Sequence, residues 1–124
     1  YHTKHFKRVL QQLRALKIDH LYLRNFNTLS GGEQQLVWLA QTLIKEPELI
    51  ILDEPTSSLD IHNKTLLFSH LQRLHTTAGI SIICITHDIY LLKKIKGMLL
   101  TLSKDKSTFS KITPSVIDNF YDID

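Results

Sequence analysis

The chain has 124 residues, of which 43% are hydrophobic and 22% are charged, with 4 glycines and 3 prolines. These values are typical of a globular domain, so collagen-like, low-complexity and wholly disordered chains are excluded. The net charge is +3, from 15 Lys and Arg against 12 Asp and Glu. The one dense basic run is Lys93, Lys94 and Lys96, with Lys104 and Lys106 nearby, and it indicates a solvated face rather than a nucleic-acid patch. We therefore expect no nucleic-acid partner.

Cysteine usage and hydropathy predict the compartment. Cys84 is the single cysteine, so an internal disulfide and an oxidising compartment have no support. No apolar stretch reaches the roughly 18 residues that a membrane-spanning helix needs. The sequence predicts a cytoplasmic chain with no membrane span of its own.

Histidine is unusually frequent, with seven residues in the chain. His2 and His5 have helical spacing, but no cysteine or carboxylate joins them in a metal-binding pattern. The count therefore indicates surface histidines rather than a metal site.

Apolar periodicity predicts two helices in the first third of the chain. Residues from Phe6 to Leu16 recur at helical spacing and predict an amphipathic helix that ends near Ile18. An irregular connection is expected over residues 19–29. A second helix is expected over residues 34–45.

The start of this second helix has its own signal. Ser30 is followed three residues later by Glu33, which is the capping-box pattern and places the helix N-terminus at Gly31 and Gly32.

The remaining elements alternate strands and helices. Residues 49–52 and 80–85 are apolar runs of strand length, typical of strands buried on both faces of a parallel sheet. Between them, Asp60 is placed to cap a helix over residues 61–76, which gives a βαβ unit and an α/β fold. Beyond the second strand the sequence predicts further short elements, namely a helix from Asp88, strands at 98–102 and 108–112, and a helix from Pro114.

Polar residues follow both expected strands. Asp53 and Glu54 come directly after the first strand, and His87 follows the second. Ligands of open α/β sheets bind beyond the carboxyl ends of the strands, so we expect these three side chains to face one crevice. Such a set suits phosphoryl transfer, with one acid near Mg²⁺, a second acid orienting water and a donor on the phosphate. A solvated turn that merely ends a strand is the structural alternative.

The two glycines at the expected helix start provide a second candidate site. Gly31 and Gly32 would let backbone N–H groups approach an anion, which the helix dipole favours, and Ser30 could donate to a phosphate. An ordinary capping box accounts for the same residues. No G-x-x-x-x-G-K-[ST] phosphate loop (Walker A) occurs in the sequence, so the phosphate site is incomplete in this chain.

Four segments together resemble the second half of an ATP-binding-cassette (ABC) ATPase. Residues 29–33 resemble the ABC signature, residues 49–54 the Walker B strand, residues 58–60 the D-loop and His87 the switch histidine. The resemblance covers essentially the whole chain. It implies a P-loop NTPase core with parallel strands and flanking helices, in which residues 1–29 are the remainder of the helical subdomain. Residues 30–124 would be the C-terminal part of the nucleotide-binding core, with the Walker A half absent.

The resemblance also implies roles and ligands, ATP and Mg²⁺. Asp53 would help to hold Mg²⁺ through water, Glu54 would orient or activate the attacking water, and His87 would contact the γ-phosphate. Asp60 would communicate across a head-to-tail dimer. Ser30, Gly31 and Gly32 would grip the γ-phosphate of ATP bound by the opposite subunit. Glu33 and Asp60 complete the expected set of cofactor-binding residues.

This sequence departs from the family pattern at three positions. Glu33 stands where many members have Gln. Leu36 and Gln41 stand where arginines are common, so no role of those arginines carries over to this chain.

The segment 54–60 resembles transporter cassettes, and residues 29–37, 113–116 and 120–123 resemble importers of iron chelates, cobalamin and metal chelates. The resemblance implies a second ABC ATPase subunit, a membrane permease and, indirectly, an extracytoplasmic substrate-binding protein. The subunit would be peripheral on the inner face of the cell membrane.

Two hypotheses follow. In the first, the chain is part of an ATP-hydrolysing subunit that powers import, and this chain alone is inactive. In the second, it is a stand-alone, non-catalytic module that pairs with a complete ABC ATPase. A cellular product near 14.4 kDa would favour the module, and one about twice as large would favour the subunit.

Overall fold

The computed structural model describes residues 2–121 of the chain. Two compact units are present, Tyr1–Thr86 and His87–Asp124, called here the first and the second unit. The division expected from the resemblance, between residues 29 and 30, follows family segments rather than compactness and stays a prediction. No helix within the described residues is long and apolar enough to cross a membrane.

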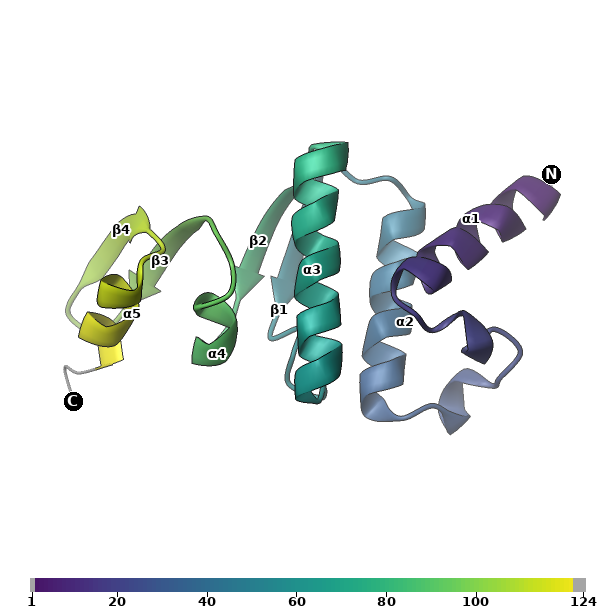
Figure 1. Ribbon diagram of the computed structural model, residues 1–124, viewed down its shortest axis with the longest axis horizontal. Helices are drawn as coiled ribbons and strands as arrows, with labels where there is room; N and C mark the ends of the chain where they lie inside the picture. Colours follow the sequence, from purple (N-terminus) through teal and green to yellow (C-terminus); the bar gives the residue numbers. More distant parts are fainter. Residues whose placement is uncertain (1, 122–124) are drawn as a thin grey trace. The chain divides into compact units, whose positions relative to one another are not determined.

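The first unit contains the predicted helices and strands in the predicted order (Figure 1). Two short 3-10 turns lie in the connection that was expected to be irregular. The elements are α1 (His2–Ala15), η1 (Asp19–Leu21), η2 (Phe26–Thr28), α2 (Gly31–Ile44), β1 (Leu49–Asp53), α3 (Ile61–Ala78) and β2 (Ser81–Ile85). Helices α1 and α2 pack against each other. Both carry buried leucines, Leu13 on α1 and Leu36 and Leu39 on α2.

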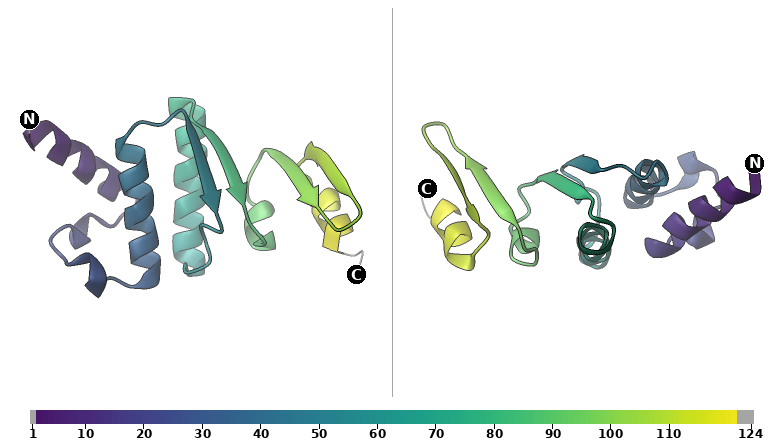
Figure 2. Two further views of the ribbon diagram at one scale, coloured as in Figure 1. Left: turned by 180° about the vertical axis from the view of Figure 1, so that it is seen from behind. Right: turned by 90° about the horizontal axis from the view of Figure 1, so that it is seen from above.

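The centre of this unit is the βαβ arrangement that the sequence predicts. Strands β1 and β2 are parallel, with Ile50 opposite Ile82 and Asp53 opposite Ile85. Helix α3 lies along one face of the pair (Figure 2), and Ile50 is buried on the sheet. The α/β fold with parallel strands and flanking helices is thereby confirmed.

The prediction that both strands are buried on both faces is wrong for the described chain. Four aliphatic side chains on alternate positions are about half or more exposed: Leu49 at 49%, Ile51 at 63%, Ile83 at 52% and Ile85 at 52%. Side chains on a strand alternate between the two faces, and helix α3 covers only one. The aliphatic composition of the runs thus includes a second face that no described element of the first unit covers.

We expect this uncovered face to make the isolated 124-residue chain self-associate or unfold easily. Exposed apolar sheet surface and open strand edges favour pairing between chains. Sedimentation velocity combined with thermal unfolding measures both properties. A monomer that unfolds cooperatively at high temperature would contradict the expectation.

The second unit consists of α4 (Ile89–Leu92), the antiparallel hairpin β3 (Met98–Leu102) and β4 (Ser107–Lys111), and α5 (Pro114–Tyr121). As predicted, Asp88 caps α4, since its carboxylate accepts a hydrogen bond from the Leu91 N–H at 3.3 Å. Strand β4 begins one residue earlier than predicted. Helix α5 buries Ile117, which is 1% exposed.

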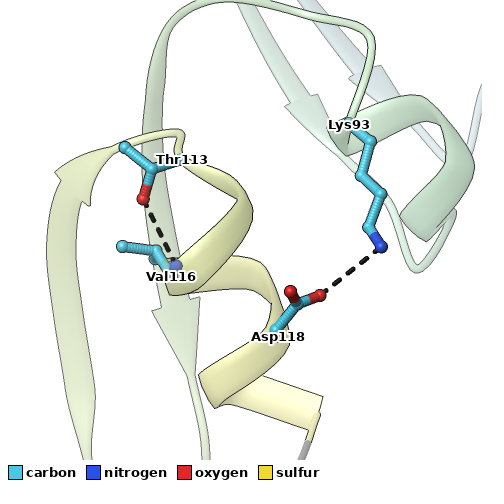
Figure 3. Close-up of polar contacts among 4 residues, drawn as sticks. All are labelled: Lys93, Thr113, Val116 and Asp118. Atoms are coloured by element: carbon cyan, nitrogen blue, oxygen red, sulfur yellow. Dashed lines mark hydrogen bonds and ion pairs between the residues drawn. The ribbon is translucent and has the colours of Figure 1, made fainter.

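Polar contacts fix α5 within this unit (Figure 3). The Lys93 ammonium, at the end of α4, lies 3.4 Å from the Asp118 carboxylate. The Thr113 hydroxyl accepts from the Val116 N–H at 3.3 Å and so caps the first turn of α5. Of the closing segment 120–123 that resembles importers, residues 122 and 123 lie outside the described residues.

Candidate nucleotide site

The N-terminus of α2 has the predicted capping box. The Ser30 hydroxyl accepts from the Glu33 N–H at 3.2 Å, and the Glu33 carboxylate accepts from the Ser30 N–H at 2.9 Å. The Ser30 backbone donor lowers the pKa of Glu33, so this carboxylate is ionised at neutral pH. Gly31 and Gly32 form the first turn, where backbone N–H groups lack intrahelical acceptors and the helix dipole favours an anion.

The second of these glycines is also required by packing. A Cβ on Gly32 would lie 2.9 Å from the Ser58 carbonyl oxygen and 3.2 Å from Leu59 Cδ2. A Cβ on Gly31 would meet the Ser58 side chain at an ordinary 3.7 Å. The start of α2 therefore packs closely against the loop that resembles the D-loop. Of the two glycines, it is Gly32 that makes this close contact.

This difference predicts unequal stabilities for two alanine variants. Both substitutions gain helix propensity, but only Gly32→Ala forces the Ser58 backbone to move, so it should be less stable than Gly31→Ala by roughly 2 kcal/mol. Urea unfolding of the two variants side by side measures the difference. Equal stabilities would show that the loop at Ser58 yields without cost.

The acidic pair lies at the carboxyl end of β1. Asp53 is the last residue of the strand and is exposed, whereas Glu54 is half-buried. Glu54 has φ of 47°, in the left-handed region, and its N–H donates to the Ile85 carbonyl at 2.8 Å. The sheet thus ends in a sharp turn at Glu54.

Cys84 reports on the electrostatics of this end of the sheet. Burial raises the pKa of its thiol to about 11, and the charges of Glu54 and Asp53 add to the effect. The thiol is therefore protonated at neutral pH, which rules it out as a nucleophile there. The negative charge that opposes a thiolate would attract a cation.

Asp60 caps α3, as predicted. Its carboxylate accepts a hydrogen bond from the Asn63 N–H at 2.7 Å, and the preceding turn is closed by the Leu59 N–H, which donates to the Thr56 carbonyl at 3.1 Å. Any role of Asp60 in an intersubunit contact would have to coexist with this cap.

The site residues divide between the two units. Asp53, Glu54 and the start of α2 belong to the first unit, whereas His87 is the first residue of the second and is exposed. That His87 converges with the acids in one crevice stays a prediction.

Sequence reasoning missed one residue that the structure brings to the acidic turn. The Gln35 side-chain amide donates to the Glu54 carbonyl oxygen at 3.2 Å, across 19 positions of sequence. A glutamine on an amphipathic helix gives no signal of such a contact, because its partner is a main-chain atom of a distant segment.

The residues fit an Mg²⁺ ion that is held largely by its nucleotide. The described residues contain no group of three His, Cys, Asp or Glu side chains that could hold a metal. Mg²⁺ commonly keeps several waters and binds through one or two carboxylates together with substrate phosphates. The exposed Asp53 carboxylate is suited to that limited role.

A parallel α/β unit with acids beyond one strand and a glycine-rich helix start beside the same loop is the pattern of a nucleotide-binding protein. Comparison with known families agrees, since the family model described as ABC transporter matches residues 1–57.

Known relatives are ATP-binding subunits of importers. The chain is 35% identical over 113 residues to the zinc import ATP-binding protein ZnuC of Wigglesworthia glossinidia brevipalpis, covering 87% of this chain and 49% of that protein. It is 41% identical over 81 residues to the molybdate/tungstate import ATP-binding protein WtpC of Pyrococcus horikoshii, covering 65% and 24%. The chain thus spans about half or less of the length of these relatives.

Solved structures give the same result. A metal-chelate type ABC transporter in an inward-facing conformation matches with a TM-score of 0.77 and 34% identity, over 86% of this chain and 43% of that one. A dimeric bacterial ABC transporter cassette matches with a TM-score of 0.61 and 34% identity, over 68% and 37%. By sequence and by structure, the chain is similar to the ATP-binding cassettes of ABC transporters.

Proposed function

We propose that this chain is part of the ATP-hydrolysing subunit of an ABC importer, which couples ATP binding and hydrolysis to solute uptake. The observation that carries the proposal is the acidic turn at the end of β1, where Glu54 follows Asp53 with a left-handed backbone and its N–H donates to the Ile85 carbonyl. Asp53 would hold Mg²⁺ through water, and Mg²⁺ would neutralise the phosphate charge. Glu54 would orient the attacking water and accept its proton.

The start of α2 is suited to a phosphate. Ser30, Gly31 and Gly32 would contact the γ-phosphate of ATP bound by the opposite subunit of a head-to-tail pair, and His87 would contact the γ-phosphate of its own subunit's ATP. The capping box supports this role because it holds Ser30 and Glu33 in place before any ligand binds. A dimeric relative supports the pairing, in which Asp60 would communicate across the interface.

The proposed partners are a membrane permease, a second ABC ATPase subunit and, indirectly, an extracytoplasmic substrate-binding protein. The subunit would lie at the inner face of the cell membrane, bound to the permease. An iron chelate or cobalamin is the proposed solute, which the metal-chelate type of the structural relative supports. Relatives named as import ATP-binding proteins for zinc, for spermidine and putrescine, and for molybdate and tungstate supply the comparison set of solutes.

The test is hydrolysis and uptake by the full-length protein reconstituted with its permease in vesicles. We expect Mg-ATP-dependent uptake of a ferric chelate or cobalamin in preference to zinc, spermidine and molybdate. Calorimetric titration of the isolated 124-residue chain with Mg-ATP should show no binding, because the sequence contains no phosphate loop. A full-length protein that hydrolyses no ATP would overturn the proposal, and uptake of another solute would overturn only the choice of solute.

A further inference from the structure

Gln35 joins two parts of the candidate site that are distant in sequence. It lies on α2, one turn beyond the glycines, and is half-buried. Its side-chain Nε2 donates to the carbonyl oxygen of Glu54 at 3.2 Å, while its Oε1 is buried and has no hydrogen-bond partner within the part of the chain that the structure describes. The contact with Glu54 therefore fixes which way this amide points.

The Glu54 backbone needs such support. A non-glycine residue in the left-handed region is strained and persists only where its surroundings hold it. Glu54, with φ of 47°, is held from two sides: its N–H donates to Ile85 on β2, and its carbonyl accepts from Gln35 on α2. Its carbonyl also accepts from the Ser57 N–H at 3.3 Å. Of these contacts, only the one from Gln35 reaches the turn from helix α2.

A second contact makes this connection stiff. Gly32, at the start of α2, lies so close to the Ser58 carbonyl that no side chain fits between them. The two contacts lie about one helical turn apart on α2 and reach the two ends of the short segment 54–58. A displacement of the start of α2 is therefore expected to move the Glu54 turn, because both ends of segment 54–58 contact this helix.

We propose that Gln35 is a positioning residue that couples the glycine-rich start of α2 to the orientation of Glu54. The inference rests on the proposed function. In a head-to-tail pair, the start of α2 faces the nucleotide of the opposite subunit, whereas Glu54 serves the nucleotide of its own subunit. Gln35 thus transmits phosphate contact at one site to the hydrolytic carboxylate of the other.

Two substitutions of Gln35 test the contact, with its neighbour as the matched control. Gln35→Leu removes the donor, and Gln35→Glu keeps the shape but presents oxygens to the Glu54 carbonyl. Gln34 donates in the same way to the Phe26 carbonyl at 3.1 Å, so Gln34→Leu removes an equivalent hydrogen bond that does not reach the turn. We expect the Glu54 amide to exchange with deuterium about three- to tenfold faster in both Gln35 variants of the full-length protein and unchanged in Gln34→Leu.

Activity provides the second readout. In the full-length protein, both Gln35 variants should lower kcat by about three- to tenfold with KM for Mg-ATP unchanged, whereas Gln34→Leu should retain the wild-type kcat. In a Glu54→Gln background, Gln35→Leu should change the residual single-turnover rate by less than about twofold, because the group that it positions is already gone. A general folding defect would instead lower the rate in both backgrounds.

Each failure has a distinct meaning. A wild-type protein without ATPase activity contradicts the proposed function, while the exchange of the Glu54 amide still shows whether Gln35 holds the turn. An active wild type whose Gln35 variants match Gln34→Leu in kcat and in amide exchange overturns the role of Gln35. An equal loss in the Glu54→Gln background also overturns it, since Gln35 would then act through another group.

Discussion

Replacing Glu54 by glutamine is expected to lower the ATP turnover of the full-length protein by about 10²–10⁴-fold while Mg-ATP stays bound. Glutamine keeps the shape of the side chain and the strained backbone of the turn, which depends on the main-chain contacts to Ile85 and Gln35. It cannot accept the proton of the attacking water. Binding should therefore survive and hydrolysis should not.

Single-turnover hydrolysis together with nucleotide retention after gel filtration measures both halves of this result. Glu46→Gln is the matched control, because Glu46 is an exposed glutamate whose carboxylate lies 3.4 Å from Arg8, outside the site. It should hydrolyse ATP at the wild-type rate. Normal turnover in Glu54→Gln would show that Glu54 takes no part in hydrolysis. Asp53 and Glu54 would then be a solvated turn that merely ends the strand.

Lowering the pH from 6.5 to 4 is expected to cost the protein at most about 3 kcal/mol through His70 alone. His70 is 4% exposed on the inner face of α3, and burial together with the neighbouring Arg73 charge lowers its pKa to about 4. Arginine has only donors, so the Arg73 guanidinium, 2.8 Å away, requires an unprotonated Nδ1 on His70.

The direction of this change in stability follows from proton binding to His70. Between pH 6.5 and 4 the unfolded chain binds a proton at His70 that the folded chain does not bind, so stability falls as the pH falls. Above pH 6.5 the contribution is constant, and below pH 4 it has been lost. Urea unfolding should show this pH dependence in wild type but not in His70→Gln, so the stability difference between the two proteins should shrink as the pH falls from 6.5 to 4.

His62, which is exposed on the same helix, provides the control variant His62→Gln. If wild type and His70→Gln change in stability by the same amount over this pH range, the buried imidazole is not the group that titrates. The burial of His70 also corrects the expectation that the histidines lie on the surface. That expectation came from a count, which does not show that position 70 shares the inner face of α3 with Leu67 and Leu71.

The local parts of the fold were predictable because their causes are local. A serine three residues before a glutamate satisfies the backbone donors of one helix turn, and the predicted capping box at Ser30 is present. Asp60 and Asp88 cap their helices for the same reason. The strand–helix–strand order likewise led to a parallel pair.

The candidate site was predictable only in part. Strand ends are visible in a sequence, so Asp53 and Glu54 could be placed at the edge of the sheet. The hydrogen bonds that hold Glu54 could not be predicted. They join its main-chain atoms to Ile85 and Gln35, which lie 31 and 19 positions away in the sequence. Hydrogen bonds to a backbone carbonyl require no particular residue at the accepting position, so they leave no pattern there.

The sequence by itself determined the helix starts, the strand runs and the motifs of an ATP-binding cassette, because propensity, capping and short-range spacing act over a few residues. Only the tertiary structure decided which face of the β1–β2 pair is covered, why Gly32 rather than Gly31 excludes a side chain, and how Gln35 reaches Glu54. Those features depend on distances between segments far apart in the chain, and such distances are set by packing.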